Sequence, residues 1–138
     1  MAAGADPFAD RGALPPLVRV KGVIQPSAAN IMALVDRPDL LRVLVGYDEF
    51  RDALMISRDG TTWRDLRDTD YLELRRDFER LGVAKVDKTT VRDAVAWCGW
   101  HHRFDSAITW AQSLVWDGVS RVEGFLSRYL GCEDTAYT

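Results

Sequence analysis

The stretch Asp68-Thr-Asp-Tyr-Leu-Glu-Leu-Arg-Arg-Asp-Phe-Glu-Arg-Leu-Gly82, with the segment that follows it, decides the fold class. Its large apolar side chains recur at the spacing of one helix face: Tyr71, Leu74, Phe78 and Leu81. The acidic and hydroxyl residues at its start are typical of a helix cap, and Gly82 is typical of a helix end. A second, long helix is predicted over residues 89–102, beginning at Asp87 to Thr89.

Shorter elements are predicted on either side of this helix pair. Ser27 is a suitable cap for a first helix, which Arg37-Pro38 ends because proline disfavours helical geometry in the residue before it. Leu17 to Ile24 alternates apolar and basic residues and could form a short edge strand or an extended arm. Further helices are expected over Leu40 to Val45, over residues 107–115, and after the cap Ser120.

One β-hairpin is predicted in the middle of the chain. Asp59-Gly60 favours a tight turn, because both residues tolerate a positive φ. Strands are therefore expected near residues 53–57 and 61–64, with Trp63 on the buried side. The predicted fold class is mainly α (α+β): a helical bundle of about five to six helices with one small β-hairpin near residues 53–64.

Composition limits the classes of protein to which the chain can belong. It has 138 residues, 47% hydrophobic and 28% charged, which fits one soluble domain with a core. The net charge of −3 gives no global case for nucleic-acid binding. No membrane span or signal peptide is apparent, and a cytoplasmic location is expected.

We predict a flexible leader over residues 1–16, a single helical domain over residues 17–132, and the start of a truncated helix over residues 133–138.

No catalytic motif is found in the sequence. A phosphate-binding loop of the Gly-Xaa4-Gly-Lys-Ser/Thr type is absent, as is a nucleophile elbow. Asp68 and Asp70 have metal-pair spacing, but they also lie where a helix needs its cap. Cys98 and His102 are one helical turn apart, yet Cys98 falls on the apolar stripe, and no second ligand pair is evident. We therefore expect no enzyme activity, no metal and no cofactor in this segment.

Nucleic-acid contact is the more serious hypothesis from the residues. The two helices around Gly82 have some helix-turn-helix character, and basic residues lie on the first helix and near the start of the second. The proposed phosphate-contacting residues are Arg75, Arg76, Arg80, Lys85, Lys88 and Arg92. Two alternatives remain: a protein-interaction or oligomerisation module with no DNA binding, and a helix-turn-helix regulator.

Four tryptophans cluster late in the chain: Trp97, Trp100, Trp110 and Trp116. Exposed aromatic rings can stack on unpaired bases, but at helical spacing they are more often core or interface anchors. We expect at least three of the four to be largely buried, with one available to contact a neighbouring domain.

The run from Trp116-Asp117-Gly118 through Arg121 to Tyr129-Leu130-Gly131 resembles the virulence-associated protein E family. Tyr47-Asp48-Glu49-Phe50 and Thr90-Val91-Arg92-Asp93-Ala94 fit the same order of features more weakly. His101-His102-Arg103-Phe104 departs from it, because an Asn-Arg-Phe or Asn-Xaa-Phe pattern is expected there.

These family members are phage and prophage proteins with a P-loop NTPase domain, related to primase-helicases. The resemblance implies an accessory region preceding an ATPase domain that lies beyond Thr138, with ATP and Mg²⁺ bound there. It also implies an accessory role in replication, in which the region contacts single-stranded or origin DNA and supports assembly of a homo-oligomer. Residues expected to contact the missing domain are Trp116, Tyr129 and Tyr137.

Overall fold

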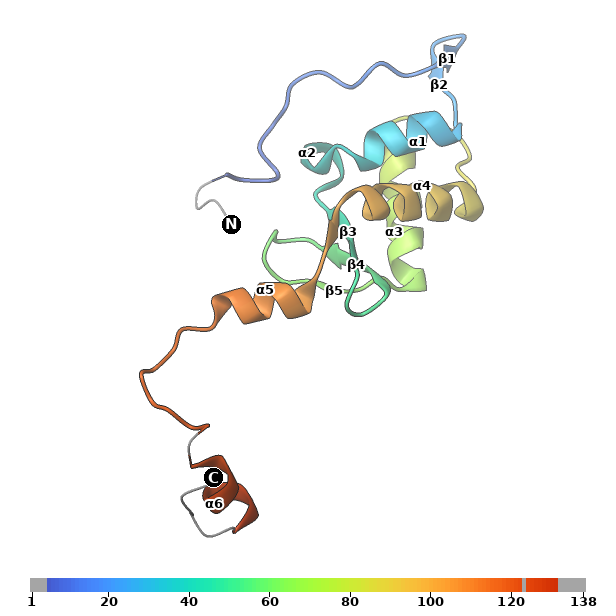
Figure 1. Cartoon of the computed structure of the whole chain (residues 1–138). Coiled ribbons are helices and arrows are strands. Elements are labelled where there is room, and N and C mark those ends of the chain that lie inside the picture. The colour runs from blue at the N-terminus through green and yellow to red at the C-terminus, as the bar shows by residue number, and fades with distance from the viewer. Residues whose placement is uncertain (1–4, 123, 132–138) are drawn as a thin grey trace.

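A computed structural model describes residues 5–122 and 124–131 of the chain. The described elements follow one another in this order (Figure 1): β1 (Arg19–Val20), β2 (Val23–Ile24), α1 (Ala28–Val35), α2 (Pro38–Leu41), β3 (Leu44–Asp48), β4 (Ala53–Ser57), β5 (Arg64–Asp65), α3 (Asp68–Arg80), α4 (Lys88–His101), β6 (Arg103–Phe104), α5 (Ser106–Ser113) and α6 (Phe125–Leu130). None of the described helices combines the length and apolarity needed to cross a bilayer.

A four-stranded sheet with the order β5-β4-β3-β6 lies at the centre of the fold. β3 and β4 form an antiparallel hairpin in which Leu44 pairs with Ser57 and Asp48 with Ala53. β5 extends the hairpin on one side, and β6 pairs in parallel with β3 on the other. A separate two-stranded ribbon, β1–β2, precedes α1.

The sheet contradicts the predicted fold class. The protein is a mixed α+β structure, with six helices and two sheets among the described residues, rather than a helical bundle with one hairpin. The helix expected over Leu40 to Val45 is wrong, because Arg42 takes a left-handed conformation (φ 55°) that ends α2, and the chain continues as β3. The hairpin prediction located β4 correctly, but the partner strand β5 lies at Arg64–Asp65, and β3 was missed.

The hydrophobic core lies between the sheet and α1, α3 and α4. Ile31, Leu34, Leu74, Phe78 and Val95 are all fully buried in it. The apolar stripe predicted for α3 is confirmed at Tyr71, Leu74 and Phe78, which all lie in this core.

α4 approaches β3 closely because glycine stands at the crossing point. A Cβ atom on Gly99 would lie 2.6 Å from Leu54 Cδ2 and 3.2 Å from the Gly46 carbonyl oxygen. The absence of a side chain at Gly99 therefore sets the distance between helix and sheet.

Capping residues explain where several helices begin. The Ser27 side chain accepts a hydrogen bond from Asn30 N, and Asp87 accepts one from Thr90 N at 2.8 Å, so both predicted caps are confirmed. Asp70 caps α3 from inside the helix, since its Oδ2 accepts from Arg67 N at 2.7 Å. Its Oδ1 pairs with Arg64 Nη2 at 2.7 Å, which supports the capping interpretation of this acidic cluster.

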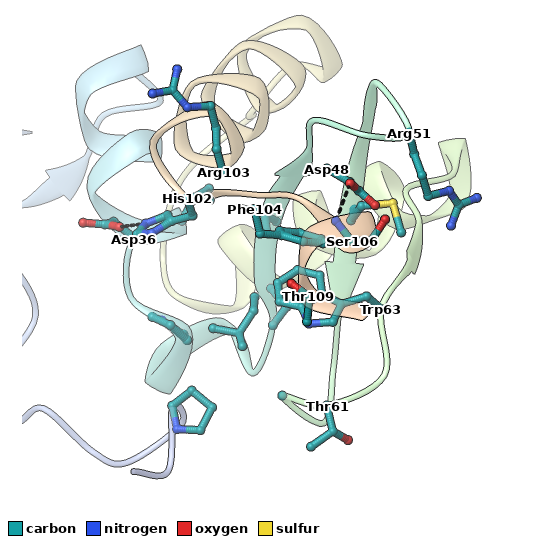
Figure 2. Close-up of a pocket in the computed structure, with 18 of the residues that line it drawn as sticks. Asp36, Asp48, Arg51, Thr61, Trp63, His102, Arg103, Phe104, Ser106 and Thr109 are labelled. Carbon is teal, nitrogen blue, oxygen red and sulfur yellow. Dashed lines mark hydrogen bonds and ion pairs between the residues drawn. The ribbon is translucent and has the colours of Figure 1, made fainter. Parts of the chain in front are cut away.

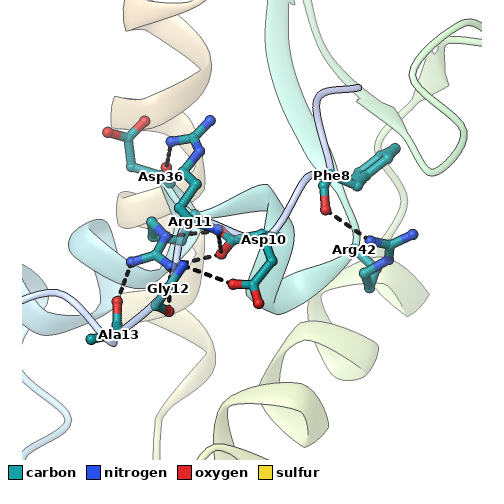
Figure 3. A network of polar contacts seen from close by, with 9 residues as sticks. Phe8, Asp10, Arg11, Gly12, Ala13, Asp36 and Arg42 are labelled. Carbon is teal, nitrogen blue, oxygen red and sulfur yellow. Dashed lines mark hydrogen bonds and ion pairs between the residues drawn. The ribbon is translucent and has the colours of Figure 1, made fainter. Parts of the chain in front are cut away.

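Residues 5–16 contain no helix or strand, yet they contact α2 and its flanks (Figure 3). Arg11 N donates to Asp39 Oδ2 at 3.0 Å, and Arg37 Nη1 donates to the Ala13 carbonyl at 2.8 Å. Phe8 is buried, and its carbonyl accepts from Arg42 Nη1 at 3.0 Å. The segment expected as a leader thus covers one edge of the domain.

Candidate functional site

A cavity of about 1080 Å³ borders the outer face of the sheet (Figure 2). Because successive strand residues face opposite sides, Asp48 and Met55 lie on this face, while Ile56, next to Met55 in β4, faces the core. The Phe104 and Trp63 rings, with centroids 5.1 Å apart, form part of the lining. α5 adds Thr109 and Trp110, and the segment before α1 adds Pro7 and Arg11.

Asp48 connects the β3–β4 hairpin to the start of α5. Its side chain is fully buried, and Oδ1 accepts hydrogen bonds from Phe50 N and Ser106 N, each at 3.1 Å. Burial alone would raise its pKa, but hydrogen bonds from Ser106 and from the backbone of Arg51 and Phe50 outweigh it and lower the pKa. The carboxylate is therefore ionised at neutral pH, and in this buried position it fixes α5 against the sheet.

The basic residues at the end of α4 are occupied by neighbouring groups. His102 Nε2 lies 3.0 Å from Asp36 Oδ1, and the His101 ring nitrogen Nδ1 lies 2.8 Å from the Trp97 carbonyl. Arg103 lies over the Trp100 ring at 4.5 Å and pairs with Glu49 at 3.3 Å. These contacts support a structural interpretation of the cluster rather than a catalytic one.

No group of three or more His, Cys, Asp or Glu side chains that could hold a metal ion occurs among the described residues. Cys98 is buried in the core, and burial raises the pKa of its thiol to about 12. A thiol with this pKa stays protonated at neutral pH and is a poor metal ligand or nucleophile.

The six predicted phosphate-contacting residues do not form one patch. Lys88 and Arg92 lie at the start of α4, where each pairs with Asp68, at 3.4 and 3.7 Å. Arg75 is half-buried, and Lys85 is exposed in the connection between α3 and α4. Arg76 and Arg80 lie on another side of α3, next to α2.

Arg76 and Arg80 line a hollow of about 260 Å³ together with two arginines that the sequence did not single out, Arg42 and Arg58. Arg42 follows α2, and Arg58 follows β4. No periodic pattern could have found this set, because its members come from three separate parts of the chain. The positive φ at Arg42 helps to place its side chain here, since it turns the backbone at the end of α2.

The C-terminal part of the described chain exposes its large apolar side chains. Ile108, Trp110 and Leu114 of the α5 region are all exposed, and Val115 and Val122 are almost fully so. The expectation that most of the clustered tryptophans are buried is wrong, since the exposed fractions are 46% for Trp97, 51% for Trp100, 65% for Trp110 and 76% for Trp116.

The Trp116-Asp117-Gly118 motif forms a turn that is held by its own residues. Asp117 accepts from Val119 N at 3.0 Å and pairs with Arg121 at 2.6 Å, and the Arg121 hydrogen bond lowers the pKa of Asp117. Gly118 has a φ of 80°, which favours glycine. The turn leaves Trp116 outside any core. Tyr129, another expected interface residue, is also exposed, and Tyr137 lies outside the described residues.

No protein-family model matches the chain, and no curated protein matches it. The resemblance to the virulence-associated protein E family therefore stays a prediction from its motifs.

Proposed function

We propose that this chain is a non-catalytic accessory domain that docks on a neighbouring domain through residues 106–130. In the setting that the resemblance implies, this neighbour is the ATPase domain of a phage or prophage replication NTPase. The accessory domain would position that ATPase, support its assembly, and contact DNA through arginines beside α3. A second copy of the chain is the alternative docking partner.

The observation that carries this proposal is the exposure of large apolar side chains over residues 108–122 and at Phe125, Tyr129 and Leu130. α5 contains no buried residue, although its sequence includes Ile108 and Trp110. Contiguous exposed apolar surface marks interaction sites in soluble proteins. Asp48 supports the same role, because it holds the start of α5 in a fixed position on the sheet.

Hydrogen exchange tests the docking surface. The chain is measured alone and mixed with the NTPase domain that the resemblance predicts beside it. Protection is expected in residues 106–122 of the mixture, and Trp116→Ala should weaken the complex about tenfold or more, since buried tryptophans are frequent hot spots. Trp97→Ala is the matched control, because Trp97 is exposed on α4 and outside the docking segment.

Absence of protection with the NTPase would contradict this proposal. Concentration-dependent protection of the chain alone would instead favour the oligomerisation module. ATP turnover by the purified chain that survives rigorous purification would show that it is an enzyme, against the proposal.

A further inference from the structure

Four arginines line one small hollow at the side of α3. Arg76 and Arg80 are one helical turn apart on α3, Arg42 comes from the end of α2, and Arg58 comes from the end of β4. The hollow has a volume of about 260 Å³. The remaining lining consists of Asp77 and the aliphatic side chains of Leu40, Leu41 and Leu81.

The positive charge of this cluster is only partly neutralised. Arg58 pairs with Glu73, and Arg80 lies 3.5 Å from Asp77. Arg42 donates to the Phe8 carbonyl and stacks on the Phe8 ring, which leaves its charge uncompensated. Arg76 is exposed and has no ion-pair partner among the described residues.

The guanidinium groups around the hollow repel one another, and a bound anion would reduce this repulsion. Like charges four residues apart on a helix destabilise it, and here two further guanidinium groups add to the repulsion. The guanidinium fork matches the oxygens of a phosphate group and binds them bidentately. A phosphate oxygen in the hollow would meet donors from α3 and from the ends of α2 and β4.

The size of the hollow indicates which part of a phosphate-containing ligand it can hold. Pockets for whole small molecules have volumes of roughly 300–1,000 Å³, so a hollow of about 260 Å³ suits a phosphate group better than a complete nucleotide. None of the described residues that line the hollow has an aromatic ring to stack on a base. The rest of the ligand must then lie outside the hollow. This is the arrangement expected when a nucleic-acid strand crosses a protein surface and is held by its phosphates.

We propose that Arg42, Arg58, Arg76 and Arg80 bind a backbone phosphate of a nucleic-acid strand. This inference rests on the DNA contact proposed above and assigns that contact to the arginine hollow. Lys88 and Arg92, which share Asp68 as an ion-pair partner, do not line the hollow.

Fluorescence anisotropy with a labelled single strand, and with the duplex of the same sequence, tests the assignment. The variant Arg76→Gln/Arg80→Gln is compared with Lys88→Gln/Arg92→Gln, which removes the same charge from the same helix pair. Arg58→Gln serves as a second hollow variant, and circular dichroism verifies that each variant is folded.

The hollow variant should lose about tenfold or more in affinity at roughly 50 mM salt, and the control about threefold at most. The slope of log K against log salt should also shrink by about 0.7–0.9 in the hollow variant, because one phosphate contact is lost.

Each other outcome overturns the assignment in a different way. If the control variant loses affinity and the hollow variant does not, DNA contact stands and the hollow is not its site. Equal losses indicate diffuse attraction. Absence of binding by the unaltered chain removes both the DNA contact and this inference, while the docking proposal is unaffected.

Two further probes distinguish other phosphates. Inorganic phosphate that raises the Tm of the unaltered chain but not of the hollow variant, without DNA binding, indicates a small-anion site only. Binding to phosphatidylglycerol vesicles, lost in the hollow variant and without DNA binding, indicates a lipid headgroup. Either result overturns the nucleic-acid assignment.

Discussion

α3 and α5 both carry large apolar side chains, but these lie in opposite environments. In α3, Tyr71, Leu74 and Phe78 are packed into the core against α4 and the sheet. In α5, Ile108 and Trp110 lie in solvent, and no residue of the helix is buried. Near the start of each helix an acidic side chain accepts a hydrogen bond from a backbone N–H. Asp70, inside α3, accepts from Arg67 N, and Asp105, just before α5, accepts from Ile108 N, so capping does not account for the difference.

What differs is the presence of a surface to pack against. α3 follows β5 directly and meets α4 across the core, whereas α5 starts at the edge strand β6 and runs away from the other helices (Figure 1). An amphipathic sequence predicts that a helix packs its apolar face against another apolar surface. It does not predict whether that surface belongs to the same chain or to another molecule.

The largest expected effect comes from removing a core side chain of α3. Phe78→Ala should lower the free energy of unfolding by about 3–5 kcal/mol, because Phe78 is fully buried and the substitution leaves a cavity. Urea denaturation followed by circular dichroism measures it. A loss below about 1 kcal/mol would mean that α3 is not part of the cooperative core.

A smaller effect is expected from the buried carboxylate at the start of α3. Asp70→Asn should cost about 1–3 kcal/mol, since the Arg64 pair is weakened and Arg64 itself is partly exposed to solvent. The Arg64 hydrogen bond, stronger than the opposing effect of burial, lowers the pKa of Asp70 below its ordinary value of 3.8.

This pKa shift fixes the sign of the pH dependence. A carboxyl whose pKa is lower in the folded state stabilises the fold above the unfolded pKa. That contribution should disappear as the pH falls from about 4 through the lower folded-state pKa. Urea midpoints measured between neutral and acidic pH should fall less steeply in Asp70→Asn, and an equally steep fall in both proteins would contradict this assignment.

Adding one methyl group at the helix–sheet contact should cost about 1 kcal/mol. Gly99→Ala gains helix propensity but forces Leu54 and the Gly46 carbonyl aside, and overpacking outweighs the gain. In the Leu54→Ala background the same substitution should be neutral or stabilising, because the nearest obstructing atom is gone. A double-mutant cycle measures this coupling, and additive effects would show that α4 and the sheet adjust freely.

The smallest effect is expected in α5. Trp110→Ala should change the free energy of unfolding of the isolated chain by less than about 0.5 kcal/mol, as at other exposed positions. The same urea titration used for Phe78→Ala checks it. A loss above about 2 kcal/mol would place α5 in a packed core and remove the contrast with α3.

The elements that sequence could predict are those specified by neighbouring residues. Ser27 and Asp87 act within a few positions, and each caps its helix as expected. At the Asp59-Gly60 turn only Gly60 has a positive φ, and β5 begins at Arg64 rather than directly after the turn. The β3 strand could not be found in this way, because the backbone turn at Arg42 uses a conformation that arginine rarely adopts. β6 is two residues long and is specified by its distant partner β3.

The candidate site was less predictable than the fold. The predicted list of basic residues along α3 and α4 includes Arg76 and Arg80, which line the hollow, and Lys88 and Arg92, which do not. Arg42 and Arg58 join the hollow only through tertiary structure. The exposure of the tryptophans could not be predicted for the same reason. A sequence shows which side chains are apolar, but not which other segments pack against them.

The parallel pair β3–β6 has a kinetic consequence. It joins Tyr47 to Arg103, which are far apart in the sequence, so the chain between them must be closed into a loop before the pair is formed. Contacts between residues this distant in sequence form late in folding, after local hairpins and helices. β6 is expected to join the sheet after the β3–β4 hairpin and α4 have formed. Since α5 starts directly after β6, the docking helix would reach its final position only on a domain that has already folded.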